Sequence, residues 1–161
     1  MTEASAAQGT GRDETELERI DRNLNELLQE LRVALPGVQV LFAFLLILPF
    51  NERFKDVTSF EKDVYLATLL ATALASVLLI APSMHHRILF RSDNKERILF
   101  HAHRFAMAGL AVLGVAITLA VLLVTHFVFG QGTAIVAAAL CTGAMLLAWV
   151  AIPVRTLLSE R

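Results

Sequence analysis

Four of the five histidines in this chain lie within one short stretch, residues 81–105, which reads APSMHHRILFRSDNKERILFHAHRF. Histidine binds metal ions, and its charge changes between about pH 5 and 8, so the stretch could hold a metal site or a proton sensor. A turn centred on Asp93 would place His85 and His101 eight residues away on either side, at one level of a helical hairpin. These two histidines are the candidates for a proton sensor.

The spacing does not favour a metal site. His85 and His86 are adjacent, so on a helix they point about 100° apart, whereas helical zinc sites use histidines four residues apart. The single cysteine, Cys141, excludes an intrachain disulfide and a multi-cysteine metal site. We therefore expect these histidines to lie at a membrane interface, and we predict no metal, no cofactor and no catalytic residue.

Long apolar segments flank this stretch. Hydrophobic residues make up 56% of the sequence and the mean hydropathy is +0.61, which is too high for a soluble domain of this size. A helix rises about 1.5 Å per residue, so each of these apolar segments, folded as a helix, comes close to or exceeds a hydrocarbon thickness of about 30 Å. The sequence therefore predicts an all-α fold, a four-transmembrane-helix bundle. Its four uncharged spans are residues 33–50, 64–82, 105–129 and 133–154.

The rest of the chain surrounds this transmembrane domain, residues 33–154. Residues 1–12 are rich in small and polar residues and are expected to be a disordered tail. No cleavable signal peptide is expected, because the first 32 residues are highly charged. Residues 13–32 predict an amphipathic cytoplasmic helix, and residues 155–161 a cytoplasmic tail.

The positive charges predict how the spans are oriented. Eleven of the fourteen lysines and arginines lie in the two terminal segments and the second connection. Because positive residues concentrate on the cytoplasmic side, we expect these three segments to be cytoplasmic in a bacterial plasma membrane. A tight hairpin is predicted between the third and fourth spans, at Gly130, Gln131 and Gly132, and it makes these two spans antiparallel neighbours.

The predicted amphipathic helix carries an apolar seam of alternating three- and four-residue spacing. Residues 13–32 have a net charge of −4, whereas residues 83–104, which predict a basic helical hairpin, carry +3. We expect the second span to continue beyond a kink at Pro82 to Arg91, a new helix to begin near Lys95, and the acidic helix to dock on this hairpin. The seam is formed by Leu17, Ile20, Leu24, Leu27 and Leu31, and in docking Glu26 and Glu30 would approach Arg87, Arg91 or Arg97.

The first span contains two features that interrupt its apolar character. Pro36 is expected to start the membrane helix, since proline is tolerated in the first helical turn. Gln39 is the one amide in this span and is the candidate for an intramembrane polar contact, with a neighbouring helix, with a carbonyl freed by the proline, or with a pore or transported solute.

Two blocks of sequence resemble a known family. NELLQELRVALPGVQVLFAFLLILPFNERF and YLATLLATALASVLLIAPSMHHRILFR are similar to an uncharacterised actinobacterial family of small four-span membrane proteins, some of which carry a sodium:proton antiporter label. The resemblance covers residues 23–154, and it implies four spans but no established functional residue. The predicted spans hold no Asp, Glu, Lys or Arg, which argues against an antiporter acting alone.

Three classes of function remain to be weighed. The first is a non-catalytic scaffold or accessory subunit that uses its acidic helix and basic hairpin for contacts. The alternative is a small oligomeric ion transporter or channel, antiporter-like, with Gln39 on its path. An enzyme is not expected, because no nucleophile–base arrangement or phosphate-binding loop is present. The expected partners are membrane lipid and a second copy or another membrane protein, and not nucleic acid.

Overall fold

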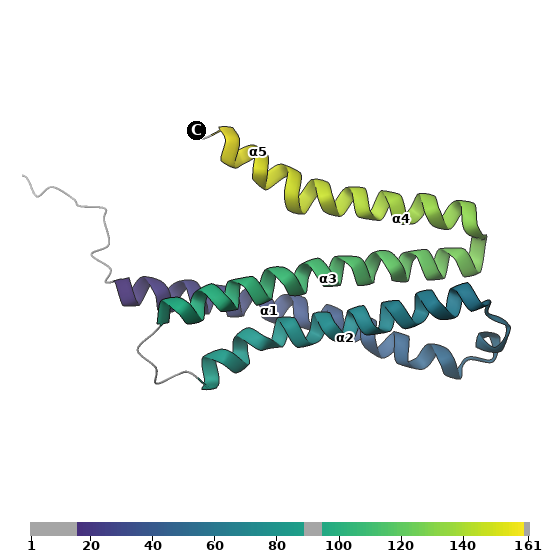
Figure 1. Cartoon of the computed structure of the whole chain (residues 1–161), viewed down its shortest axis with the longest axis horizontal. Helices are drawn as coiled ribbons and strands as arrows, with labels where there is room; N and C mark the ends of the chain where they lie inside the picture. The colour runs from purple at the N-terminus through teal and green to yellow at the C-terminus, as the bar shows by residue number, and fades with distance from the viewer. Residues whose placement is uncertain (1–15, 89–94, 160–161) are drawn as a thin grey trace, which may run out of the picture.

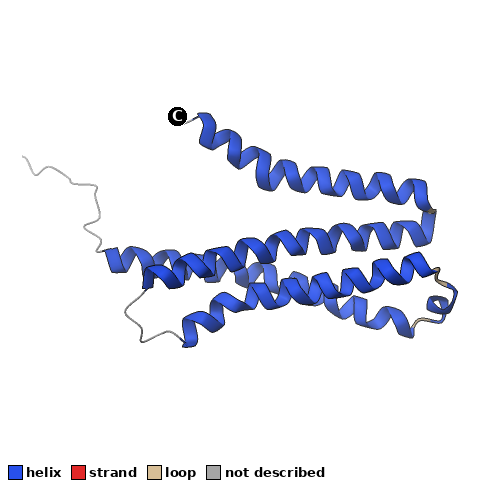
Figure 2. Ribbon diagram, viewed as in Figure 1, coloured by secondary structure: helices blue, strands red, loops and turns tan. Residues whose placement is uncertain are grey.

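The computed structural model describes residues 16–88 and 95–159, and these residues form helices and no strand (Figures 1 and 2). Four helical segments are long and apolar enough to cross a membrane, namely Glu18–Phe50, Ser59–His85, Leu99–Phe129 and Gln131–Ser159. The predicted all-α four-helix bundle is therefore confirmed. In chain order the elements are α1 (Glu16–Ile47), the 3-10 helices η1 (Leu48–Phe50) and η2 (Glu52–Asp56), α2 (Ser59–Ile88), α3 (Lys95–Phe129), α4 (Gln131–Leu146), the π-helix η3 (Leu147–Ala151) and α5 (Ile152–Ser159).

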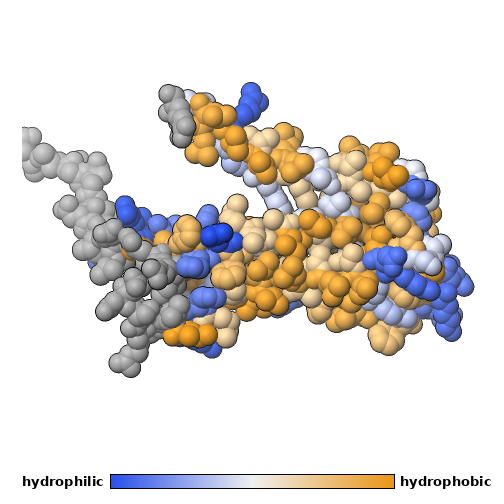
Figure 3. All heavy atoms as spheres, viewed as in Figure 1, coloured by the Kyte–Doolittle hydropathy of each residue, from blue (hydrophilic) through white to orange (hydrophobic). Residues whose placement is uncertain are grey.

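The spans alternate in direction, which gives the bundle two distinct ends (Figure 1). The start of α1, the end of α2, the start of α3 and the end of α5 lie at one end, here called the Glu16 end. The first connection, residues 48–58, and the turn at Gly130 lie at the other, here called the Gly130 end. Apolar side chains cover the middle of the visible surface, with polar ones towards both ends, as a bilayer requires (Figure 3).

Helix α1 is one continuous helix through Pro36, so the expectation that Pro36 starts the membrane helix is wrong. Proline inside a helix removes one backbone hydrogen bond and normally weakens the helix. Here Leu31 and Val38, which lie on either side of the proline, are both buried in the core of the bundle. Packing on both sides of Pro36 therefore holds the two halves of α1 in line.

At the Glu16 end α2 and α3 follow the sequence prediction as far as they are described, and the predicted turn at residues 92–94 lies outside the described residues. Helix α2 runs through the buried Pro82 to Ile88, and α3 begins at Lys95. Both helices thus extend past the limits of their predicted spans, and they carry the histidine-rich stretch on their ends.

The core lies among α1, α2 and α3. Its buried residues are Leu31, Val38, Ala75, Leu79, Ala106 and Leu113. Small residues let α2 and α3 approach closely, because lipid-exposed helices associate by backbone packing and not by hydrophobic exclusion. One such residue is Gly109, where an added Cβ would lie 2.7 Å from Leu79 Cδ2.

Helices α4 and α5 pack differently. The turn before α4 is a single residue, Gly130, whose φ of +86° is a left-handed conformation that favours glycine. This confirms the predicted hairpin of antiparallel third and fourth spans. Helix α4 packs along α3, and Figure 1 shows that α4 and α5 diverge from the other helices towards the C-terminus. Among the described residues from Gln131 to Ser159, Ala134 alone is buried.

Candidate functional site

The most polar contact inside the bundle is at the Gly130 end, where α2 begins. The residues Thr58-Ser59-Phe60-Glu61 form a capping box, in which the first and fourth residues bond to each other's backbone amides. The Thr58 amide donates to Glu61 Oε2 at 2.8 Å, and the Glu61 amide donates to Thr58 Oγ1 at 3.3 Å. The sequence thus fixes where α2 starts and how the Glu61 side chain is directed.

Glu61 also receives hydrogen bonds from two side chains. The Thr58 hydroxyl donates to Glu61 Oε2 at 2.9 Å, and His126 Nδ1 lies 3.0 Å from Glu61 Oε1. Glu61 is only 6% exposed, so its charge is largely removed from solvent. A buried carboxylate is tolerated where hydrogen bonds satisfy it, and both oxygens of Glu61 have donors.

His126 is held in place by the end of α3. Its carbonyl accepts the Gly130 amide at 2.9 Å, so the residue belongs to the last helical turn before the hairpin. Its ring packs against Phe60, with the ring centres 5.2 Å apart. Because a carboxylate oxygen only accepts hydrogen bonds, Nδ1 of His126 is the donor in its contact with Glu61. The pair therefore ties the start of α2 to the end of α3.

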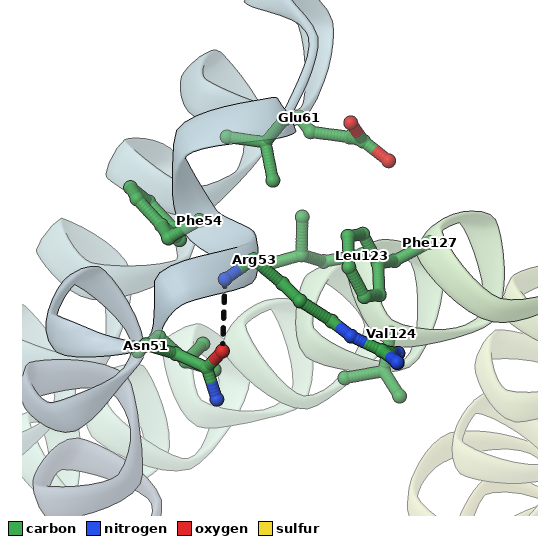
Figure 4. A pocket seen from close by; sticks show the side chains of 9 residues that line it. Asn51, Arg53, Phe54, Glu61, Leu123, Val124 and Phe127 are labelled. Atoms are coloured by element: carbon green, nitrogen blue, oxygen red, sulfur yellow. Dashed lines mark hydrogen bonds between the residues drawn. The ribbon is translucent and has the colours of Figure 1, made fainter.

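A pocket of about 310 Å³ opens beside this pair, between the first connection and α3 (Figure 4). Arg53 reaches across it towards Val124, while its own backbone amide donates to Asn51 Oδ1 at 3.1 Å. Among the described residues no acidic side chain forms an ion pair with Arg53. The pocket is lined by Leu48, Asn51, Arg53, Phe54, Val57, Glu61, Leu123, Val124 and Phe127.

The sequence did not single out this site. The predicted second span begins at residue 64, which leaves Glu61 outside it, and His126 lies near the far end of the predicted third span. The capping-box pattern from Thr58 to Glu61 was the available signal for an ordered carboxylate at the helix start. Nothing local in the sequence pairs Glu61 with a residue that follows 65 positions later.

The candidate histidines lie at the opposite end. His85 is half-buried, and its Nδ1 donates to the Ala81 carbonyl at 2.9 Å. Its ring packs on Phe105 at 5.1 Å, one turn along α3 from His101. His101 is exposed and packs edge-on against Phe100 at 5.9 Å. Over the described residues, no three potential metal ligands among His, Cys, Asp and Glu come together.

The apolar seam of α1 faces the bundle. Ile20, Leu24 and Leu31 are buried, and Leu27 packs against the core, while Leu17 lies outside the residues whose side chains are described. A groove between the starts of α1 and α3 shows that these segments lie side by side; it is lined by Arg19, Ile20, Asn23, Leu27, Leu99, Phe100 and His103.

The charged residues proposed for docking are only partly described. Glu26 Oε1 lies 3.7 Å from Arg22 Nε, one turn away on the same helix, and Glu30 is exposed. Arg87 is exposed at the end of α2. Arg91 and the side chain of Arg97 lie outside the described residues, so contacts between them and the acidic helix stay a prediction.

Gln39 is exposed on α1, next to the buried Val38. An exposed amide in the middle of an apolar helix would face lipid in an isolated copy of the chain. Its proposed polar contact therefore has to come from outside the three-helix core.

Comparison with known proteins gives a family. A family model described as a family of unknown function, DUF6328, matches residues 13–153. No match was found among curated proteins or among solved structures.

Proposed function

Because the chain belongs to DUF6328, a family of unknown function, we propose a role from its geometry. The protein is a non-catalytic scaffold or accessory subunit of a membrane assembly. It contacts its partner through the polar side of the first half of α1 and through the basic hairpin formed by the ends of α2 and α3.

The observation that carries this proposal is the length and packing of α1. The helix has 32 residues and is about 48 Å long, whereas the hydrocarbon layer is about 30 Å thick. Its first half must therefore project beyond the hydrocarbon. Because its seam is buried against the bundle, this projecting half is held in a fixed orientation. Its exposed polar residues include Glu18, Arg19, Asp21, Asn23, Asn25, Glu26, Gln29, Glu30 and Arg32.

The buried polar groups favour a non-catalytic role. In the described part of the chain, the buried polar or charged residues are Glu61, Thr68 and Thr72. The two threonine hydroxyls donate to the Val64 and Thr68 carbonyls of their own helix. Each of these buried polar side chains thus already has its hydrogen-bond partners. Glu61 contacts one other titratable group, His126, and none of the three is aligned with a nucleophile.

A second contact surface lies within the membrane. Helices α4 and α5 touch the rest of the bundle through α3, and most of their large apolar side chains are exposed. In the membrane this surface meets lipid, a second copy of the chain or another membrane protein. An accessory subunit that uses α4 and α5 inside the bilayer and α1 outside it would engage its partner over both regions.

The proposal is tested by comparing two charge-reversed variants. The chain is purified in a mild detergent from its native cells, and proteins that co-purify in fixed ratio are quantified. Glu26→Lys together with Glu30→Lys should reduce recovery of the partner about tenfold or more, since like charges across an interface are unfavourable. The matched control, Glu52→Lys with Asp56→Lys, makes the same charge change at the Gly130 end, where both residues are exposed. Equal recovery from the two double variants would contradict the proposal.

One observation favours a second role, as a small oligomeric ion transporter or channel. The exposed Gln39 amide lies on an apolar helix, and a second copy that covered it would place polar groups at a shared interface. The pure protein in liposomes would then conduct ions, and Gln39→Leu would abolish the flux. Flux that persists in Gln39→Leu would exclude a path through this residue.

A further inference from the structure

We propose that the pocket beside Arg53 binds an anionic phospholipid of the membrane leaflet at the Gly130 end. The phosphate would lie on the Arg53 guanidinium, and one acyl chain would run along the apolar wall formed by α3. This site does not depend on the proposed scaffold role.

The shape and lining of the pocket fit one end of an amphiphile. Its volume of about 310 Å³ accommodates part of an acyl chain, and Leu123, Val124 and Phe127 of α3 line one side. Phe54 and Val57 of the first connection line the other. The pocket is open, so a chain can enter it from the surrounding bilayer without unfolding any helix.

The hydrogen-bond donors of Arg53 are the group in the pocket that can bind an anion. Glu61 also lines the pocket, but Thr58 and His126 already donate to both of its oxygens. Arg53 forms no ion pair with a described acidic side chain, and Figure 4 shows its guanidinium directed towards Val124 and away from the Glu61 carboxylate. The Arg53 guanidinium is thus available to donate to a ligand, whereas both Glu61 oxygens already accept hydrogen bonds within the protein.

The position and chemistry of Arg53 match a phosphate group. The residue lies in the connection between two membrane spans, which is the level at which phospholipid head groups occur. A guanidinium donates two parallel hydrogen bonds to a phosphate, which a lysine ammonium cannot do. The apolar wall begins directly beneath it, so head group and chain are recognised together.

The test is lipid binding to the full-length protein, measured by native mass spectrometry from detergent. Phosphatidylglycerol is titrated against phosphatidylcholine with the same acyl chains, and oleate is titrated separately. The intact protein should prefer phosphatidylglycerol. Arg53→Gln should weaken phosphatidylglycerol binding by about tenfold or more, the change expected for one charge-assisted pair, while phosphatidylcholine binding stays low.

Two further variants make the result specific. Lys55→Gln removes one positive charge from the same connection without touching the pocket, and it should leave the affinity unchanged. Val124→Trp fills the pocket and leaves Arg53 in place, and it should reduce phosphatidylglycerol binding as strongly as Arg53→Gln.

Several results would overturn the proposal. One is that Arg53→Gln or Val124→Trp binds phosphatidylglycerol as tightly as the intact protein. Another is that Lys55→Gln loses as much affinity for phosphatidylglycerol as Arg53→Gln, which would indicate general attraction by surface charge. Tighter binding of oleate than of phosphatidylglycerol would show that the ligand is a fatty acid and not a phospholipid.

Discussion

His126 Nδ1 lies 3.0 Å from Glu61 Oε1, and this contact joins the last turn of α3 to the first turn of α2. The two residues are 65 positions apart, yet both are placed by local features: a capping box at Thr58 for one and the Gly130 hairpin for the other. The contact closes the Gly130 end of the three-helix core.

Replacing His126 by alanine should destabilise the protein. The substitution leaves Glu61 Oε1 buried without its donor, which costs about 1–3 kcal/mol of the free energy of unfolding. The measurement is denaturant unfolding in a mild detergent, followed by circular dichroism. His103→Ala is the matched control, because His103 is exposed, and it should change stability by less than about 0.5 kcal/mol. Equal stability of the two variants would show that the contact with Glu61 contributes nothing.

Gly109→Ala should destabilise the contact between α2 and α3. The new Cβ would lie 2.7 Å from Leu79 Cδ2, closer than such atoms approach, so the buried Leu79 side chain or the two helices would have to shift. Overpacking of this kind costs about 1–3 kcal/mol. Gly143→Ala is the control, since nothing lies within 4 Å of its added Cβ, and it should be neutral or slightly stabilising.

A second substitution checks the cause of the Gly109→Ala effect. Leu79→Ala alone leaves a cavity and is expected to destabilise the core. Combined with Gly109→Ala, it removes the clashing atoms, so the double variant should be more stable than the sum of the two single effects predicts. Strict additivity would mean that Gly109 acts through something other than Leu79.

The seam of α1 should protect the hairpin at the Glu16 end. Leu24 is 6% exposed, and Leu24→Ser removes apolar contacts that hold the first half of α1 against the bundle. Trypsin cleavage after Arg87 and Arg104 should then be about tenfold faster in the variant. Asn25→Ser changes the neighbouring exposed residue and should leave the cleavage rate unchanged. Equal protection of both variants would contradict docking of α1.

The distribution of positive charge predicts that the Glu16 end faces the cytoplasm. In a background with Cys141→Ala, single cysteines introduced as Asp56→Cys and Ser159→Cys are treated with a membrane-impermeant thiol reagent in intact cells. Asp56→Cys should react, and Ser159→Cys should react only after the cells are opened. The reverse pattern would invert the topology.

Much of the fold was predictable because it depends on local properties of the sequence. Uncharged segments long enough for a bilayer indicated four spans, and the glycines around residue 130 indicated the hairpin. The passage of α2 through Pro82 was predicted as well and is confirmed.

The errors and omissions have a different origin. Pro36 was expected to start a helix because proline is unfavourable inside one, but burial of Leu31 and Val38 outweighs that local preference. The pairing of Glu61 with His126 and the pocket at Arg53 depend on which helices are neighbours. That arrangement is set by packing across the whole bundle, and no short pattern encodes it.

The single-residue turn at Gly130 has a consequence for recognition from that side of the membrane. A connection this short exposes almost no epitope, so an antibody or a soluble receptor approaching this face would find mainly residues 48–58. That segment carries Glu52, Arg53, Lys55 and Asp56, all exposed. A new binding specificity on this face would therefore arise mainly from changes in residues 48–58.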